Sequence, residues 1–252
     1  MDNKTQVEAI VRLNPNPKGF GATPDELSAE DFVSALPRQH SHSFFEDEQQ
    51  GIFIGLWDTN DMVEAPGPYA CDEFMLVLEG QVNIRDNSSG RLTTVSAGEA
   101  FVIPKGFDCQ WQQRGYLRKF YFISEHPEES VPAYPAHAGV IVLSGNSGHS
   151  SPEGGTLFPP GMVQHAKEHI GYIDHRARFS AGSWQSEAFA TPSFTLSRHS
   201  LLSVVSGAIT LIDNGGGEHQ FTAGDACFIS AKTVCSAKAS TPVSLHYAAC
   251  EA

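Results

Sequence analysis

Short apolar runs that end at glycine-containing turns recur along the chain. Phe74–Leu78 ends at Gly80, Leu201–Val205 ends at Gly207, and Ala100–Ile103 has a similar composition. Many short apolar runs punctuated by glycine turns are typical of the strands of a sandwich or a barrel. The pattern therefore predicts an all-β fold.

Two further segments carry local signals of secondary structure. Thr23 and the following Pro24 suit the cap and the first position of a helix, which predicts a short helix over Thr23–Ala35. Val140–Leu143 predicts one strand inside a stretch that is rich in Pro, Ser, Gly and His. We interpret that stretch as a linker.

The apolar pattern occurs twice. Gly55-Leu56-Trp57 returns as Gly182-Ser183-Trp184, 127 positions later, and Ala97-Gly98-Glu99 returns as Ala223-Gly224-Asp225, 126 positions later. Collinear self-similarity at one period indicates two structurally equivalent domains. We therefore expect an N-terminal arm over residues 1–40, a first barrel over 41–125, a linker over 126–156 and a second barrel over 157–252.

Composition and charge narrow the functional classes. A chain of 252 residues can hold about two domains of ordinary size. The net charge is −13 and the 16 Lys and Arg residues form no basic run, so we expect no binding to nucleic acids or membranes. No apolar run reaches the ~20 residues that a transmembrane helix needs, and the N-terminus lacks the apolar region of a signal peptide.

The cysteines indicate the compartment. The chain has five, an odd number, and no two of them form a Cys-x-x-Cys pair. Free thiols are typical of a reducing environment, so we expect a cytoplasmic protein.

The best-defined motif lies in the first repeat. The run Ala97–Phe107, followed by Trp111 and by Arg118–Tyr121, resembles the cupin superfamily, and within it the group related to ureidoglycine aminohydrolase and ethanolamine-utilisation cupins. The resemblance implies a bicupin, with tandem jelly-roll barrels of the double-stranded β-helix type and a pocket at one mouth. It also implies a homodimer. Cupins have many different activities, so the resemblance predicts the fold better than it predicts the function.

Metal-binding cupins, as the resemblance implies, use two His and a Glu from one motif and a His from another. Here Glu73 stands at the Glu position, Pro66–Tyr69 holds no His, and Cys109 replaces the last His. The second repeat has Ser200 and Cys235 at the equivalent positions. This ligand count predicts no bound metal and no other cofactor. A divalent transition metal in the first barrel is the alternative.

Repeat one keeps more polar groups than repeat two. If Glu73 points inward, Lys119 and Tyr121 on the closing strand can face the same pocket, where they could bind a zwitterion or transfer protons. A buried Glu–Lys pair can equally be structural. Repeat two has Leu245 and Tyr247 instead, so any active barrel is the first. The candidate ligand-binding residues are Trp57, Tyr69, Glu73, Cys109, Trp111, Lys119 and Tyr121; the candidate catalytic residues are Glu73, Cys109 and Lys119.

Several of these residue types have an ordinary structural alternative. Cys109 and Cys235 could be reactive thiols, or they could fill the barrels as small apolar side chains. Trp57, Trp111 and Trp184 could line pockets or pack in the barrel walls. His199 should face away from the pocket, because neighbouring strand residues alternate.

Two histidine motifs imitate metal sites. His40-Ser41-His42 with Glu46 matches the cupin His-x-His spacing, but it precedes the strand that should carry it. His165 and His169 match the inverted zinc-protease pattern, which requires a helix, whereas this segment leads into a strand-like run. We expect neither motif to bind metal.

Three functional hypotheses follow from these residues. In the first, a metal-free bicupin binds a small polar metabolite (amino, ureido or carboxylate) in its first barrel. In the second, an enzyme resembling ureidoglycine aminohydrolase acts on a small nitrogenous compound, with Glu73 or Lys119 transferring a proton. In the third, the chain has a structural or assembly role.

Overall fold

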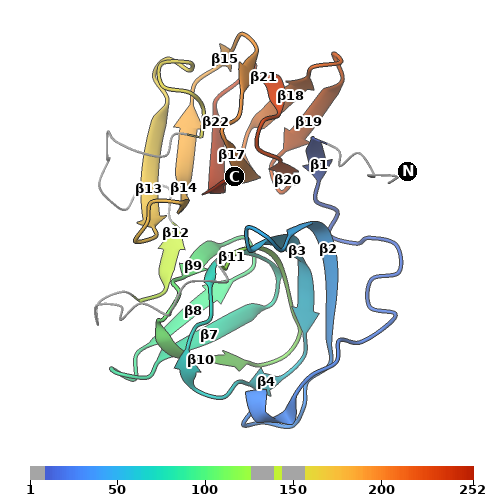
Figure 1. The fold of residues 1–252 in the computed structure, drawn as a ribbon, viewed down its shortest axis with the longest axis vertical. Helices are drawn as coiled ribbons and strands as arrows, with labels where there is room; N and C mark the ends of the chain where they lie inside the picture. The colour runs from blue at the N-terminus through green and yellow to red at the C-terminus, as the bar shows by residue number, and fades with distance from the viewer. Residues whose placement is uncertain (1–8, 126–138, 144–156) are drawn as a thin grey trace.

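The computed structural model describes residues 9–125, 139–143 and 157–252, and these form two β-barrels stacked along the long axis (Figure 1). The expected linker, residues 126–156, lies outside the described residues except for 139–143. The all-β prediction of tandem jelly-roll barrels is confirmed. Within the described residues no helix is long and apolar enough to cross a membrane.

The first barrel consists of two antiparallel sheets. The larger sheet runs in the order β12 (Ile141–Leu143), β9 (Ala100–Ile103), β6 (Asp72–Glu79), β11 (Leu117–Ser124), β3 (Ile52–Thr59) and β2 (Gln39–Asp47). The smaller runs in the order β4 (Met62–Val63), β10 (Asp108–Gln113), β7 (Gln81–Asp86) and β8 (Leu92–Ser96), and β5 (Gly67–Pro68) also pairs with β10.

The second barrel repeats this arrangement strand for strand. Its larger sheet is β1 (Ile10–Arg12), β20 (Ala226–Ile229), β17 (Arg198–Ser206), β22 (Val243–Glu251), β14 (Phe179–Ser186) and β13 (Lys167–Ile173). Its smaller sheet is β15 (Phe189–Ala190), β21 (Val234–Ala239), β18 (Ala208–Asp213) and β19 (Glu218–Thr222), with β16 (Phe194–Thr195) on β21. The sequence repeat therefore corresponds to a repeat of topology.

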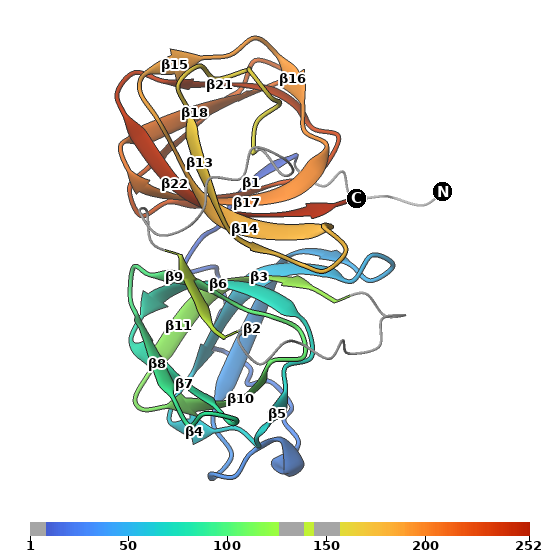
Figure 2. The ribbon, with the colours of Figure 1, turned by 90° about the vertical axis from the view of Figure 1, so that its left-hand side faces the viewer.

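The barrels exchange their edge strands. β1 pairs with β20 of the second barrel, with Ile10 opposite Ile229, and β12 pairs with β9 of the first, with Val142 opposite Phe101. Figures 1 and 2 show the dark blue β1 beside the red and orange barrel. Each barrel is thus completed by the strand that precedes the other one in the chain. β12 also confirms the strand predicted over Val140–Leu143.

The two larger sheets face each other and bury an apolar layer between the barrels (Figure 2). Phe122 of the first barrel packs edge-on against Phe179 of the second, with ring centres 5.5 Å apart. Tyr172 of the second barrel donates a hydrogen bond to Asp72 Oδ1 of the first. Burial of aromatic surface in this layer joins the barrels into one unit.

The helix predicted over Thr23–Ala35 is wrong. The segment contains one 3₁₀ turn, Ala29–Asp31, and otherwise runs as an extended loop along the first barrel. The Asp25 N–H donates to a carbonyl at the start of β2, and the Val33 N–H donates to the Val63 carbonyl. The backbone groups that a helix would pair internally are therefore bonded to the barrel instead.

Candidate functional site

A buried ion pair spans two neighbouring strands of the first barrel. Lys119 Nζ on β11 lies 2.6 Å from Glu73 Oε1 on β6, and the Tyr69 hydroxyl donates to Glu73 Oε2. Lys119 Nζ also lies 3.0 Å from Met75 Sδ. The Lys119 and Glu73 side chains are 7% and 5% exposed, so both oxygens of a desolvated carboxylate are satisfied.

Strand alternation explains why these groups meet. Met75 and Val77 belong to the apolar interior of the first barrel, whereas Phe74 belongs to the layer between the barrels. Glu73 lies on the same face as Met75, and the antiparallel register places Lys119 opposite Val77. The inward orientation that the sequence pattern suggests for Glu73 and Lys119 is thus present.

Two indole rings enclose the ammonium group. Lys119 Nζ lies 4.9 Å from the ring centres of both Trp57 and Trp111, within the range of a cation–π interaction. The two rings meet edge to face at 5.9 Å. Trp111 Nε1 is buried and has no hydrogen-bond partner among the described residues. Such an unpaired buried donor is rare and requires an explanation.

A cavity of about 290 Å³ opens beside this cluster. Of the seven sequence-predicted ligand-binding residues, six line it: Trp57, Tyr69, Glu73, Trp111, Lys119 and Tyr121. The sequence reasoning missed the remaining lining residues, which are Gln39, Ser41, Glu64 and Ile123. The cavity therefore combines aromatic walls with a few polar groups, the usual composition of a small-molecule site.

Tyr121 reaches the cavity because its strand neighbour is a glycine. Tyr121 on β11 pairs with Gly55 on β3, and a Cβ atom at position 55 would lie 2.2 Å from the Tyr121 hydroxyl oxygen. A larger residue there would displace the ring. Burial raises the pKa of Tyr121, so its hydroxyl stays protonated at neutral pH.

Glu64 is the important residue that sequence reasoning missed. Its backbone N–H donates to the Trp111 carbonyl at 3.0 Å, and its carbonyl accepts from Gln110 Nε2 at 2.9 Å. Burial raises the pKa of its carboxyl to about 7, the charge of Lys119 lowers it, and the charge of Glu73 raises it further. No sequence motif marks Glu64. It reaches the cavity only because the residues that follow β4 pair with β10.

Cys109 does not line the cavity. It lies in the apolar interior of the first barrel, where burial raises the pKa of its thiol to about 12. Cys235 occupies the equivalent place in the second barrel, and burial raises its pKa to about 11. Both groups are thiols at neutral pH, which favours the small apolar role over the reactive one.

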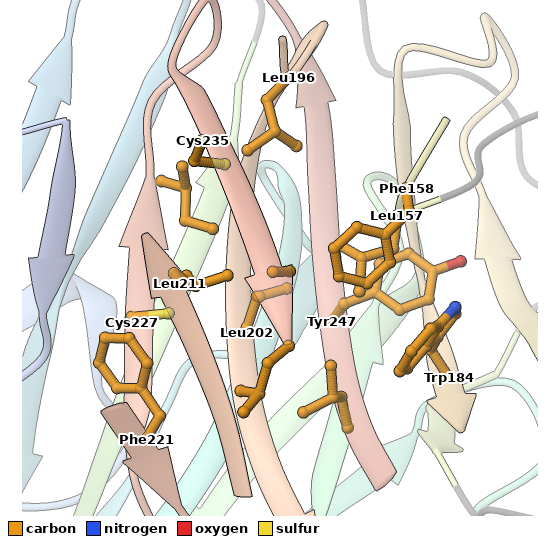
Figure 3. Packing of buried hydrophobic residues seen from close by; sticks show 14 of the residues in the cluster. Leu157, Phe158, Trp184, Leu196, Leu202, Leu211, Phe221, Cys227, Cys235 and Tyr247 are labelled. Atoms are coloured by element: carbon orange, nitrogen blue, oxygen red, sulfur yellow. The ribbon is translucent and has the colours of Figure 1, made fainter. Parts of the chain in front are cut away.

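The interior of the second barrel is filled with apolar side chains. Figure 3 shows Leu157 and Phe158 beside Trp184 and Tyr247 in one packed cluster. Leu245, which stands where the first barrel has Lys119, is fully buried in the same cluster. The ion pair of the first barrel thus has no counterpart here.

A second cavity, of about 280 Å³, lies at the mouth of this barrel beside Arg198 and Ser200. The Arg198 guanidinium donates to Ser180 Oγ at 2.8 Å and to the carbonyls of Arg178 and Ala249 at 2.6 and 2.9 Å. It therefore holds neighbouring strands together, while its Nε is buried without a hydrogen-bond partner among the described residues.

The two histidine motifs lie on strands or turns. His40 Nδ1 is 2.7 Å from Asp58 Oδ1, and its Nε2 accepts a hydrogen bond from Arg38 Nε. His169 lies on β13, and His165 lies in the turn before it. His199 points into the layer between the barrels, as alternation predicts, where its ring stacks on that of Phe228.

The residues of the first barrel do not fit a first-row metal. Glu73 has both oxygens bonded to Lys119 and Tyr69, and Cys109 is a buried thiol that does not line the cavity. Among the described residues, no three His, Cys, Asp or Glu side chains gather as a metal site would require.

Comparisons with known sequences and structures agree with this geometry. The family model of the EutQ-like cupin domain matches residues 55–121 and 174–247, once in each barrel. A solved protein of unknown function from Pseudomonas syringae pv. tomato, of the DUF861 family, is 19% identical. The alignment covers 96% of this chain and 99% of that one, with a TM-score of 0.71.

Two further solved structures share the fold. Protein Ylba from E. coli is 12% identical, with 98% of this chain and 94% of that chain covered and a TM-score of 0.55. A salicylate 1,2-dioxygenase from Pseudaminobacter salicylatoxidans is 14% identical, with 80% and 71% covered and a TM-score of 0.53. No curated protein matches this chain. At these sequence identities, the structural similarity shows only that the fold is shared.

Proposed function

Because the chain belongs to the EutQ-like cupin family and folds as a bicupin, we propose that its first barrel binds a small polar metabolite. The cavity beside Glu73, Lys119 and Tyr69 carries this proposal, since it gathers an ion pair, two indole rings and neutral polar groups. A ligand with amino, ureido or carboxylate groups could hydrogen-bond to this lining.

Two further observations support a ligand in the first barrel. Trp111 lines the cavity, and its buried Nε1 has no partner in the described part of the chain, so an acceptor on a bound ligand could satisfy it. The second barrel, built to the same topology, has a cavity of similar size, but Ser200 stands there in place of Glu73 and the buried Leu245 in place of Lys119. The ion pair beside the first cavity therefore has no counterpart in the second barrel, which supports a use for the polar groups of the first.

A thermal-shift screen followed by calorimetry tests the proposal. Small amino, ureido and carboxylate compounds are the probes, and at least one class should raise the melting temperature of the intact chain. The double variant Glu73→Gln/Lys119→Met should lose this shift. The double variant Glu218→Gln/Lys238→Met removes an exposed ion pair from the second barrel and should keep it.

Failure of every class to bind would overturn the proposal. A chain that binds none of them, and whose Glu73 and Lys119 variants differ only in stability, would instead fit the structural or assembly role.

An enzymatic role is the second candidate, and Glu64 favours it. A carboxyl with a pKa of about 7 is suited to give and take protons near neutral pH. Turnover of a bound nitrogenous compound, lost in a Glu64→Gln variant that still binds it, would establish this role. Binding without turnover leaves the cavity as a ligand site.

A further inference from the structure

Glu64 lacks a counter-ion of its own. In the described part of the chain its carboxyl forms no hydrogen bond or ion pair, whereas both oxygens of Glu73 are bonded. We propose that Glu64 makes the first cavity a site for a small organic cation, an ammonium or amidinium compound, and serves as its counter-ion. This inference rests on the proposed function and specifies the chemical class of the ligand.

The charges around the cavity favour a cation over an anion. Lys119 is the cation among the lining residues, and its ammonium is held by Glu73 and by two indole rings. An ionised Glu64 therefore leaves one negative charge in excess, and Asp31 adds to the negative potential there. An incoming carboxylate would be repelled by this potential, whereas an ammonium group would neutralise it.

The other walls suit the same ligand. Trp57 and Trp111 expose aromatic surface to the cavity, and indole faces attract cations. Gln39, Ser41 and Tyr121 supply neutral hydrogen-bonding groups for the rest of the molecule. The volume of about 290 Å³ is roughly ten times the ~30 Å³ that one water occupies in the liquid. A ligand of about ten non-hydrogen atoms or fewer can fit this volume.

Ionisation of Glu64 gives this binding a pH dependence. Burial raises its pKa to about 7, and the charge of Lys119 opposes that rise. A cation binds the ionised form, so its affinity should fall by about tenfold for each pH unit below 7. The charged and titratable groups that face Glu64 are Asp31, Tyr69, Glu73, Cys109 and Lys119, and the pKa values of Tyr69 and Cys109 are raised above the neutral range.

Calorimetry on the full chain with three matched probes tests the inference. Butylamine, N-butylurea and butyrate each have a linear chain of four carbons, counting the carboxyl carbon of butyrate, and differ in their polar end. Butylamine resembles a lysine side chain and stays protonated between about pH 6 and pH 8, so any pH dependence belongs to the protein. We expect butylamine to bind most tightly, and about tenfold more tightly at pH 8 than at pH 6.

Variants assign the effect to one carboxyl. Glu64→Gln keeps the shape of the side chain and should lose most of the affinity for butylamine at pH 8, together with its pH dependence. Glu64→Asp retains the charge and should keep the pH dependence with weaker binding. Glu48→Gln removes the same charge from the exposed turn after β2 and should behave like the unmodified chain.

The outcomes separate this inference from the function on which it rests. Binding of butyrate or N-butylurea without butylamine would overturn the cation site and leave the metabolite site standing. Butylamine affinity that is unchanged in Glu64→Gln would also overturn the cation site. If none of the three probes binds, both proposals fail.

Discussion

The charged ammonium of Lys119 lies inside the first barrel. The groups directly around it stabilise this charge. The ammonium lies against Glu73 Oε1 and above two indole rings, in a place where the side chain is 7% exposed. Removing one partner of a buried ion pair leaves the other charge desolvated and unpaired, which typically costs about 3–5 kcal/mol.

We therefore predict that Lys119→Met lowers the free energy of unfolding by about 3 kcal/mol. The double variant Lys119→Met/Glu73→Gln should recover part of this loss, because no bare carboxylate remains. Lys238→Met breaks an exposed pair with Glu218 and should change stability by less than about 1 kcal/mol. Urea denaturation measures all three, and equal stabilities would contradict a structural contribution of the pair.

His199 is the residue that should respond to acid. Its Nδ1 accepts the Ala231 N–H at 3.3 Å, and its ring packs against both Phe45 and Phe228. Burial lowers its pKa, so the unfolded chain binds more protons than the folded one below about pH 6.5. The stability that His199 contributes is present above that pH and is lost as the pH falls from there through the lower pKa of the folded state.

We predict that His199→Asn, which keeps an acceptor near the Nδ1 position, reduces the loss of melting temperature between about pH 7.5 and pH 5.5. Burial also lowers the pKa of His246, so His246→Asn is the comparison. If the melting temperature depends on pH equally in His199→Asn and in the unmodified chain, His199 does not contribute to the loss of stability in acid.

At the scale of elements, the exchanged strand β1 stabilises a barrel to which it does not belong in sequence. Ile10 is 3% exposed within the core of the second barrel, and Arg12 Nη1 pairs with Asp225 at 2.7 Å. The Leu13 N–H continues the pairing to the Ala226 carbonyl. Loss of these contacts should expose the edge of β20.

Ile10→Ala should therefore destabilise the second barrel by about 2 kcal/mol. Hydrogen exchange of the β20 amides should accelerate, while the β9 amides of the first barrel should stay protected. Val205→Ala truncates an apolar side chain that is 47% exposed on β17, and it serves as the control with little expected effect. Faster exchange in both barrels alike would contradict a local role for β1.

The sequence predicts most of what depends on local alternation. The repeat, the strands and the inward face shared by Glu73 and Met75 follow from a period of two residues, and Lys119 follows from the closing strand. Glu64 and the exchange of β1 could not be predicted, because both depend on pairing between distant segments. The helix expected over Thr23–Ala35 failed for the same reason: the barrel binds the backbone groups that a helix would have used.

At the scale of the whole molecule, the two barrels share one topology and contact each other through equivalent residues, but their interiors differ. Asp72 accepts the Lys105 N–H at 2.9 Å and the Tyr172 hydroxyl of the other barrel. His199, at the position equivalent to Asp72, accepts the Ala231 N–H and contacts Phe45 of the other barrel. The interface is thus pseudo-symmetric, while the interiors differ: the first holds the Lys119–Glu73 ion pair beside its cavity, and the second has the apolar Leu245 in place of Lys119.

Because the barrels exchange edge strands, the stability of each should depend on a strand that lies next to the other in sequence. Fragments of similar length can test this dependence. Residues 1–125 contain β1, which has no partner there, and lack β12; residues 14–143 lack β1 and contain β12, whose Leu143 is buried. We predict that fragment 14–143 is the more stable of the two in urea, because its first barrel has a complete edge. Both should be less stable than the full chain, since each exposes the apolar layer that includes Phe122. Equal stability of the two fragments would mean that β12 adds nothing to the first barrel and that the barrels depend on each other through their facing sheets alone.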